Sequence, residues 1–178
     1  KSQADMRAMA QSAAPQLVAR LQPFAAKLFA EHRAAGRPIV LATTTPYDMV
    51  EPFADLLGFD GVVATRYGVN RKGLDELANL FTGKLQACRD WAERNGVSMD
   101  ESYAYSDSIY DTPLLSAVAH PVAVNPDPRL MVFARARRWK VMHLDVPAGV
   151  AKVPVLGIEL QQLGMSFAHP ALIPYAKF

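Results

Sequence analysis

The feature that most constrains the fold is a regular alternation of short strand-like runs with longer helical segments. The helical segments place apolar residues at helical spacing, and glycines mark several of their ends. Strands that alternate with helices through short links form a parallel sheet covered by helices on both faces. The sequence therefore predicts a Rossmann-like α/β fold, whose ligands bind at the carboxyl ends of the strands. The predicted strands are residues 39–42, 61–65, 103–106, 121–124 and 140–144.

Three regions follow from this pattern. The middle region contains all the predicted strands and forms the α/β core. The first region is Ala-rich with apolar residues at helical spacing, and Pro15 and Pro23 are expected to divide it into two or three helices. The last region has a helical period over residues 153–167, which predicts a packed extension or a linker to a further domain. The predicted boundaries are 1–35, 36–145 and 146–178.

Local signals predict where several helices begin. Thr45, followed by Pro46, is expected to cap a helix, with Asp48 at the acidic position of a capping box. Asp127, also followed by a proline, is expected to cap a later helix in the same way. A further helix is predicted over residues 109–118.

Composition excludes several classes of protein. The chain has 178 residues, enough for one domain with one core. Its net charge of +2 gives no argument for a nucleic-acid partner. Cys88 is the only cysteine, which excludes an intrachain disulfide and favours a reducing, cytoplasmic setting. No signal peptide is recognisable, and no apolar run is long enough to span a bilayer.

The strongest functional signal is a pair of aspartates, Asp107 and Asp111, directly after the predicted strand 103–106. Two carboxylates four residues apart, at a strand end and helix start, can point into one crevice. Mg²⁺ typically binds one or two protein carboxylates together with phosphate and water. The alternative is structural: Asp107 or Ser108 caps the next helix, and Asp111 lies beside the positive end of its dipole. The spacing alone favours neither interpretation.

Two weaker signals come from Thr43 and Lys84. Thr43 follows the predicted strand 39–42, and its hydroxyl, with free amides at the next helix start, could hold a phosphate oxygen. The alternative for Thr43 is a helix cap. Lys84, after Gly83, is predicted at a helix start, where a cation is unfavourable unless it faces an anion. The alternative for Lys84 is an ordinary lysine in contact with solvent.

In chain order, these signals resemble three motifs of one enzyme family. Strand–Thr43, then Lys84, then strand–Asp107-x₃-Asp111 is similar to motifs two, three and four of the haloacid dehalogenase-type (HAD) phosphatases. The phrases VLATTTPYD, AYSDSIYDTPLLSAV and PVAVNPDPRL resemble most closely the phosphoserine-phosphatase-like branch, subfamily IB. The resemblance covers about residues 35–145. It implies a HAD-like core, with N-terminal helices that belong to the family's cap region.

The resemblance also implies a role for each residue. Thr43, with Thr44, would bind the transferring phosphoryl group, and Lys84 would neutralise charge on the phosphate and the nucleophile. Asp107 would ligate Mg²⁺, and Asp111 would complete the acidic site. The implied reaction is the Mg²⁺-dependent hydrolysis of a small phosphomonoester through an aspartyl-phosphate.

One motif of the family is missing from the sequence. The family's nucleophilic aspartate lies in an Asp-x-Asp sequence on an N-terminal strand, and no two aspartates of this chain are separated by a single residue. Lys1 is not an initiator methionine, so the first strand and most of the cap are expected upstream of it. The chain by itself is therefore not expected to hydrolyse phosphate.

The end of the chain adds a second resemblance. Residues 145–178 resemble the joining segment of actinobacterial proteins in which a HAD domain precedes a 1-acylglycerol-3-phosphate acyltransferase. Three hypotheses follow. The first is a phosphatase of small phosphorylated substrates. The second is an accessory or regulatory domain of a bifunctional phospholipid-synthesis protein, in which a further domain carries out acyl transfer and would bring the protein to a membrane surface. The third hypothesis is a catalytically silent fold used for binding or for forming a homodimer.

Overall fold

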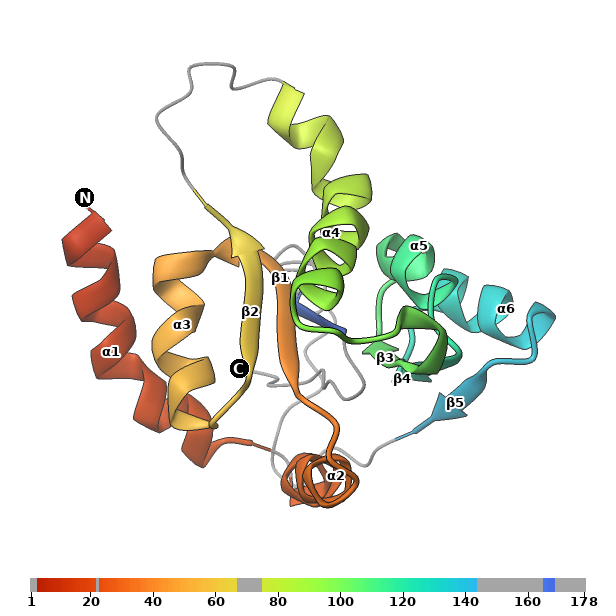
Figure 1. The fold of residues 1–178 in the computed structure, drawn as a ribbon, viewed down its shortest axis with the longest axis horizontal. Coiled ribbons are helices and arrows are strands. Elements are labelled where there is room, and N and C mark those ends of the chain that lie inside the picture. Colours follow the sequence, from red (N-terminus) through yellow and green to blue (C-terminus); the bar gives the residue numbers. More distant parts are fainter. Residues whose placement is uncertain (1–2, 22, 67–74, 144–164, 169–178) are drawn as a thin grey trace.

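The computed structural model describes residues 3–21, 23–66, 75–143 and 165–168. Its centre is a six-stranded sheet with the order β2-β1-β6-β3-β4-β5 (Figure 1). The pairs β1–β2, β3–β4 and β4–β5 are parallel. The predicted α/β fold with a mainly parallel sheet is therefore confirmed. The strands are β1 (Val40–Pro46), β2 (Gly61–Thr65), β3 (Tyr103–Ser106), β4 (His120–Val124), β5 (Lys140–Met142) and β6 (Met165–Ala168).

Strand β6 was not predicted, and it corrects two expectations. It pairs antiparallel with both β1 and β3 and lies between them, so the sheet is not wholly parallel. Residues 165–167, which were predicted to end a helix, belong to this strand. The apolar period of that segment also suits a strand buried between two neighbours, because a short apolar run does not distinguish the two structures. The rest of the predicted helix lies outside the described residues.

Helices pack along the sheet in two groups. Figure 1 shows α3 next to β2, with α1 on the far side of α3, and α5 and α6 beside β3, β4 and β5. Helix α4 contacts β1 and β2. None of the described helices is both long and apolar enough to cross a membrane. The helices are α1 (Gln3–Ala19), α2 (Pro23–Ala34), α3 (Tyr47–Leu56), α4 (Asp75–Arg94), α5 (Thr112–Leu115) and α6 (Pro128–Ala136), with 3-10 turns η1 (Met99–Glu101) and η2 (Ile109–Asp111).

Helix α4 corrects the prediction for Lys84. A break was expected near Gly83, but one continuous helix runs through this position. A single glycine inside a helix costs only about 1 kcal/mol relative to alanine, so it does not by itself end one. The buried Cys88 and the half-buried Leu85 and Trp91 pack against the core and hold the helix in place. Lys84 thus lies inside a helix, and the argument from the positive helix end does not apply to it.

Two predicted helix starts also differ from the structure. Strand β1 continues through Pro46, so Thr45 is a buried strand residue, and no side chain caps α3. Asp48 lies in the first turn of α3 without forming the expected capping box. The helix predicted over residues 109–118 is the turn η2 followed by the single turn of α5, which ends at Leu115. The expected cap of α6 by Asp127 is confirmed.

The core lies where the helices meet the central strands. β1, β3 and β4 carry fully buried apolar residues, and leucines of α5 and α6 belong to the same cluster. Burial of such a side chain stabilises the fold by about 1.5–3 kcal/mol. Because these residues fix the strand ends and the adjacent helices, they also fix the side chains that those ends carry. The largest fully buried apolar residues are Ile39, Val40, Leu41, Leu115, Val124 and Leu130.

Candidate active site

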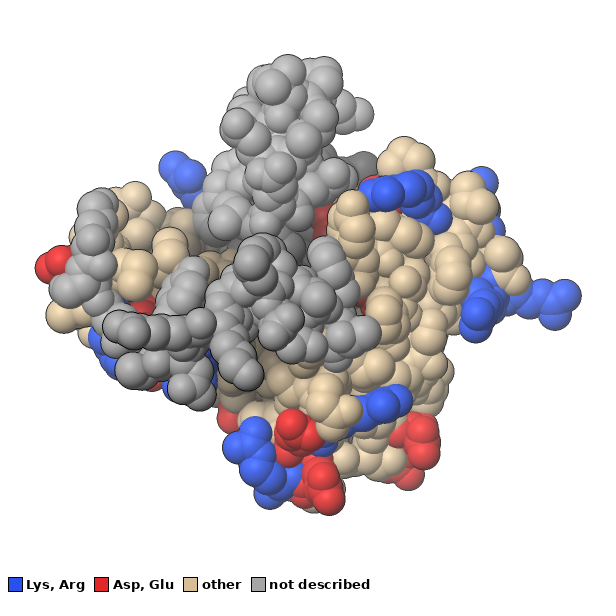
Figure 2. All heavy atoms as spheres, turned by 90° about the horizontal axis from the view of Figure 1, so that it is seen from above, with Lys and Arg blue, Asp and Glu red and all other residues tan. Residues whose placement is uncertain are grey.

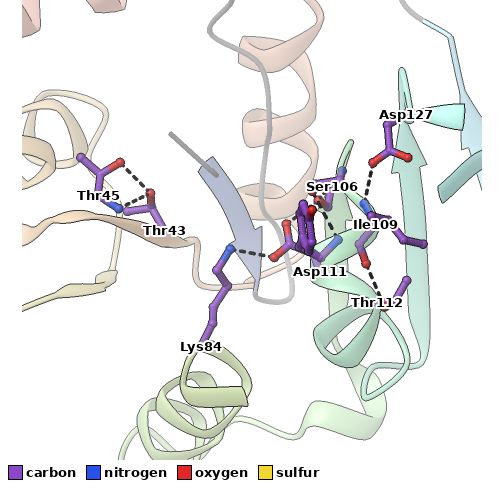
Figure 3. Close-up of polar contacts among 10 residues, drawn as sticks. Thr43, Thr45, Lys84, Ser106, Ile109, Asp111, Thr112 and Asp127 are labelled. Atoms are coloured by element: carbon purple, nitrogen blue, oxygen red, sulfur yellow. Dashed lines mark hydrogen bonds and ion pairs between the residues drawn. The ribbon is translucent and has the colours of Figure 1, made fainter. Parts of the chain in front are cut away.

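A buried ion pair lies at the carboxyl edge of the sheet. The Nζ atom of Lys84, on α4, is 2.7 Å from Oδ1 of Asp111, on η2 (Figure 3). Both side chains are almost fully buried, with exposed fractions of 8% and 4%. The other oxygen of Asp111, Oδ2, accepts a hydrogen bond of 2.6 Å from Oγ of Ser106. Both oxygens of this carboxylate therefore have partners, as a buried charge requires.

The turn from Ser106 to Asp111 is held by its own side chains. Oγ of Ser106 accepts a hydrogen bond from the backbone N–H of Ser108, at 3.1 Å. Oγ of Ser108 accepts one from the N–H of Tyr110, at 3.3 Å. The short polar residues after β3 thus satisfy backbone donors that a turn would otherwise leave unpaired. The predicted capping role of Ser108 is confirmed, and it leaves the carboxylate of Asp107 uncommitted to the cap.

Asp107 lies in an acidic environment. Burial, together with the negative charges of Asp111 and Asp127, raises the pKa of its carboxyl to about 7, against the lowering effects of a backbone hydrogen bond and of Lys84. Figure 2 looks onto this edge of the sheet, and red acidic atoms are visible near the centre of the view. The carboxyl of Asp107 thus lies close enough to interact with two further carboxylates and with the ammonium group of Lys84.

The charge of this cluster decides whether a cation fits it. An excess of one negative charge remains in this cluster when all three carboxylates are ionised, because Lys84 pairs with Asp111 and the guanidinium of Arg129 interacts with Asp127. A cation would balance that excess. Hard oxygen ligands suit Mg²⁺, which needs only one or two protein carboxylates beside water and phosphate. The described residues contain no group of three or more acidic, His or Cys side chains placed to enclose a metal. The donor set therefore fits Mg²⁺ held partly by water or substrate.

Thr43 lies apart from this cluster. Its buried hydroxyl donates a hydrogen bond to Oγ1 of Thr45 and accepts one from the N–H of Thr45, both at 3.1 Å. Strand β6 runs between β1 and β3, and Figure 3 shows Thr43 on one side of it and Asp111 on the other. Because neighbouring strands lie about 4.8 Å apart, β1 and β3 are separated by roughly 10 Å.

The carbonyl oxygen of Thr44, the second predicted phosphate ligand, accepts a hydrogen bond of 2.7 Å from Thr65.

The structure brings together only some of the residues that the sequence predicts for the site. Lys84 and Asp111 are in direct contact, and their charges affect the pKa of Asp107. Thr43 and Thr44 belong to β1, which lies on the other side of β6 from β3.

The family model for haloacid dehalogenase-like hydrolases matches residues 2–116. The chain belongs to this family. The match includes β1, α4 and the turn after β3, which carry the residues described above.

Several curated proteins are similar to the chain, and some of them are named as phosphatases. An inhibition of morphological differentiation protein from Streptomyces azureus is 41% identical over 86% of the chain and 60% of its own length. A protein named a probable phosphatase from Mycobacterium tuberculosis is 39% identical over 71% of the chain and 45% of its own length. A phosphoserine phosphatase from the same organism is 33% identical over 70% and 42%. The chain spans about half the length of these relatives.

Solved structures have the same HAD-like fold. A protein of unknown function from Bordetella pertussis has a TM-score of 0.59 and 32% identity, over 68% of this chain and 58% of that one. A HAD family hydrolase from Salmonella enterica serovar Typhi has a TM-score of 0.54 and 17% identity, over 70% and 42%. At that identity, the second likeness concerns the fold alone.

Sequence reasoning missed one residue near this HAD site. Asp127 was predicted only as the cap of α6, but its carboxylate also bonds to the turn after β3. Its position before Pro128 indicates the cap. No local pattern indicates the second contact, because it joins residues 18 positions apart in the chain.

Proposed function

We propose that this chain provides the phosphate-binding and Mg²⁺-binding side chains of a phosphomonoester phosphatase that acts through an aspartyl-phosphate. The observation that carries the proposal is the buried pair of Lys84 and Asp111 beside the raised-pKa carboxyl of Asp107. A purely structural core has no need for a buried lysine–aspartate pair beside a second desolvated carboxyl, because burial of charged groups costs free energy. Perturbed titratable groups at a strand edge are typical of functional sites.

Each residue has a proposed part. The ammonium group of Lys84, oriented by Asp111, would attract the phosphoryl group and stabilise the charge that it develops. Asp107 would bind Mg²⁺, which would act as a Lewis acid on a phosphoryl oxygen. The hydroxyl of Thr43 and the backbone at Thr44 would bind phosphate oxygens from the other side of the site. These parts rest on the geometry and on the family resemblance together.

The nucleophile is proposed to lie outside this sequence. No Asp-x-Asp pair occurs in the 178 residues, and β6, between β1 and β3, has the sequence Met-Ser-Phe-Ala, with no carboxylate. The chain alone would therefore bind phosphate without transferring it. A small phosphorylated substrate is supported by relatives named as phosphoserine phosphatase and histidinol-phosphatase.

A catalytically silent fold used for binding or dimerisation is the second candidate. The name of the Streptomyces relative, which describes an effect on differentiation and no reaction, favours it. The alternative of an acyltransferase fusion stays a prediction, because it concerns sequence beyond these residues. Homodimer formation also stays a prediction.

The deciding experiment compares this chain with the protein encoded by its full reading frame. If that protein carries an Asp-x-Asp pair, we expect it to hydrolyse para-nitrophenyl phosphate with Mg²⁺, and to lose that activity with EDTA or with Lys84→Ala. This chain should bind inorganic phosphate in the presence of Mg²⁺, measured by shifts of backbone amide NMR signals, without hydrolysis. Lys27→Ala is the control, because Lys27 is exposed and its pair with Glu31 spans 3.9 Å. A longer protein that contains an Asp-x-Asp pair and has no Mg²⁺-dependent phosphatase activity would favour the silent fold.

A further inference from the structure

The carboxylate of Asp127 connects two separate elements. Its Oδ1 accepts hydrogen bonds from the backbone N–H groups of Arg129 and Leu130, at 2.8 and 2.9 Å, and so caps α6. Its Oδ2 accepts a hydrogen bond of 2.7 Å from the backbone N–H of Ile109, in the turn after β3. Figure 3 shows this side chain directed at Ile109. One carboxylate thus connects the start of α6 to the turn after β3, which carries Asp107 and Asp111 and is called the acidic turn below.

A second bond joins the same two segments. The backbone N–H of Asp127 donates to the carbonyl oxygen of Asp107, at 2.8 Å. Asp127 therefore holds the chain on both sides of Ser108, through Asp107 and through Ile109. Hydrogen bonds to an ionised acceptor are shorter and stronger than neutral ones, so this tether restricts the backbone that carries the Asp107 carboxylate.

Helix α6 gives the tether a rigid base. Leu130 and Ala134 are fully buried in the core, and they fix the helix against the sheet. The position of Asp127 is therefore set by packing and does not depend on the turn that it holds. A turn anchored to a packed helix keeps its side chains closer to one geometry than a turn held by its own serines.

Helix capping alone does not explain a carboxylate at this position. Ser and Asn cap helices about as well as Asp. A third carboxylate beside Asp107 and Asp111 adds like-charge repulsion, which raises the pKa of Asp107. Only the second oxygen, which reaches Ile109, requires Asp, because the Asn amide nitrogen is a donor and the Ser hydroxyl is too short to serve both elements.

We propose that Asp127 is a positioning residue that holds the carboxylate of Asp107 in place for Mg²⁺. The inference rests on the proposed function, in which Asp107 binds the metal. Groups that orient a metal ligand typically change metal affinity by about 10–100-fold when they are removed. Asp127 would not touch the metal itself. It would act through the backbone of the turn after β3.

Two substitutions separate the tether from the cap. Asp127→Asn offers one acceptor oxygen, which cannot serve both α6 and Ile109, and Asp127→Ser retains a cap alone. We expect both variants to weaken Mg²⁺ binding by about tenfold, measured on the chain by amide NMR titration with MgCl₂. Hydrogen exchange at the amide of Ile109 should become faster in both, because its acceptor is lost. The control is Ala134→Gly, which destabilises α6 and leaves the tether intact.

The outcomes are distinct. If wild type binds no Mg²⁺, the proposed metal site is wrong, and the inference falls with it. If wild type binds Mg²⁺ and the Asp127 variants bind it equally well, the inference alone is overturned. A loss of affinity in Ala134→Gly as large as in the Asp127 variants would also overturn it, because general destabilisation would then explain the effect. Weaker binding and faster Ile109 exchange in the Asp127 variants only would support it.

Discussion

Lys84 and Asp111 form a buried ion pair that joins the middle of α4 to the turn after β3, with 2.7 Å between the ammonium and the carboxylate. Because both groups are buried, neither can regain water when its partner is removed. We expect Lys84→Met to destabilise the chain by about 3–5 kcal/mol, since the buried carboxylate of Asp111 keeps its hydrogen bond from Ser106 but loses its countercharge. Urea denaturation measures the change.

The double variant Lys84→Met with Asp111→Asn provides the control for this prediction. It removes the buried charge together with its partner, so it should be more stable than Lys84→Met alone. Lys27→Met, which removes an exposed pair of 3.9 Å, should change stability by less than about 1 kcal/mol. Equal losses in Lys84→Met and in the double variant would show that packing of the lysine stem dominates.

Asp107→Asn should have opposite effects on stability and on metal binding. Without metal, only the unfolded chain loses the Asp107 proton between pH 3.8 and about 7, so stability falls as the pH rises through this window and the full cost is present above it. An uncharged Asn should therefore stabilise the metal-free chain at pH 8 by roughly 2 kcal/mol, less than the full pKa shift implies because the carboxyl is partly exposed. The Mg²⁺-dependent rise in melting temperature should disappear. A variant that is less stable at pH 8 without metal would contradict the first part.

His32 should make the stability of the fold depend on pH in the opposite direction. Burial, and then the positive charge of Arg37, lower the pKa of His32 to about 4, from 6.5. Above pH 6.5 the histidine is neutral in both the folded and the unfolded chain. Between pH 6.5 and 4 only the unfolded chain gains the proton, so stability falls as the pH falls, by about 3 kcal/mol in total.

The test compares His32→Phe with wild type over this pH range. The variant loses the contacts of His32 with Tyr105 (2.9 Å) and Arg37 (3.1 Å), so it should be less stable at pH 7. Its free energy of unfolding should nevertheless depend less steeply on pH between 6.5 and 4. His143→Gln is the control, because His143 is exposed. Parallel pH profiles for wild type and His32→Phe would rule out this account.

The close approach of the Trp91 ring to Gly61, at the start of β2, leaves little room for a larger side chain. A Cβ at this position would lie 2.5 Å from Nε1 of Trp91 and within 3 Å of two further ring atoms. We expect Gly61→Ala to destabilise the chain by about 1–3 kcal/mol, because the indole or the strand must move. Thermal unfolding of Gly61→Ala, Trp91→Leu and the double variant tests it. The double variant should be more stable than the sum of the single effects allows, and additivity would contradict the clash.

Local chemistry made much of the site predictable. Asp107 and Asp111 follow an apolar strand, and the carboxyl ends of parallel strands form the binding edge, so their location could be predicted from the sequence. Lys84 was singled out for a reason that proved wrong, since it lies within a helix. Its contact with Asp111 spans 27 positions and depends on how α4 packs. Sequence spacing does not encode such a distance.

Tertiary pairing explains the remaining differences. Strand β6 owes its place to the backbone groups of β1 and β3 that it satisfies, and an apolar run with an apparent helical period does not reveal those partners. The hydrogen bond from Ile109 to Asp127 could not be predicted either, because it also depends on a partner that is distant in the sequence. The five parallel strands, by contrast, were predictable because each is a short apolar run bounded by turn residues or glycine.

The antiparallel course of β6 has a consequence for how ligands would assemble at this edge. Met165 pairs with Thr43, so β6 begins level with the first proposed phosphate ligand and keeps β1 and β3 about 10 Å apart. A phosphate ion alone is too small to touch both Thr43 and the acidic turn. Phosphate joined to a cation is large enough. We therefore expect the anion and the metal to bind cooperatively, each raising the affinity for the other by the same factor.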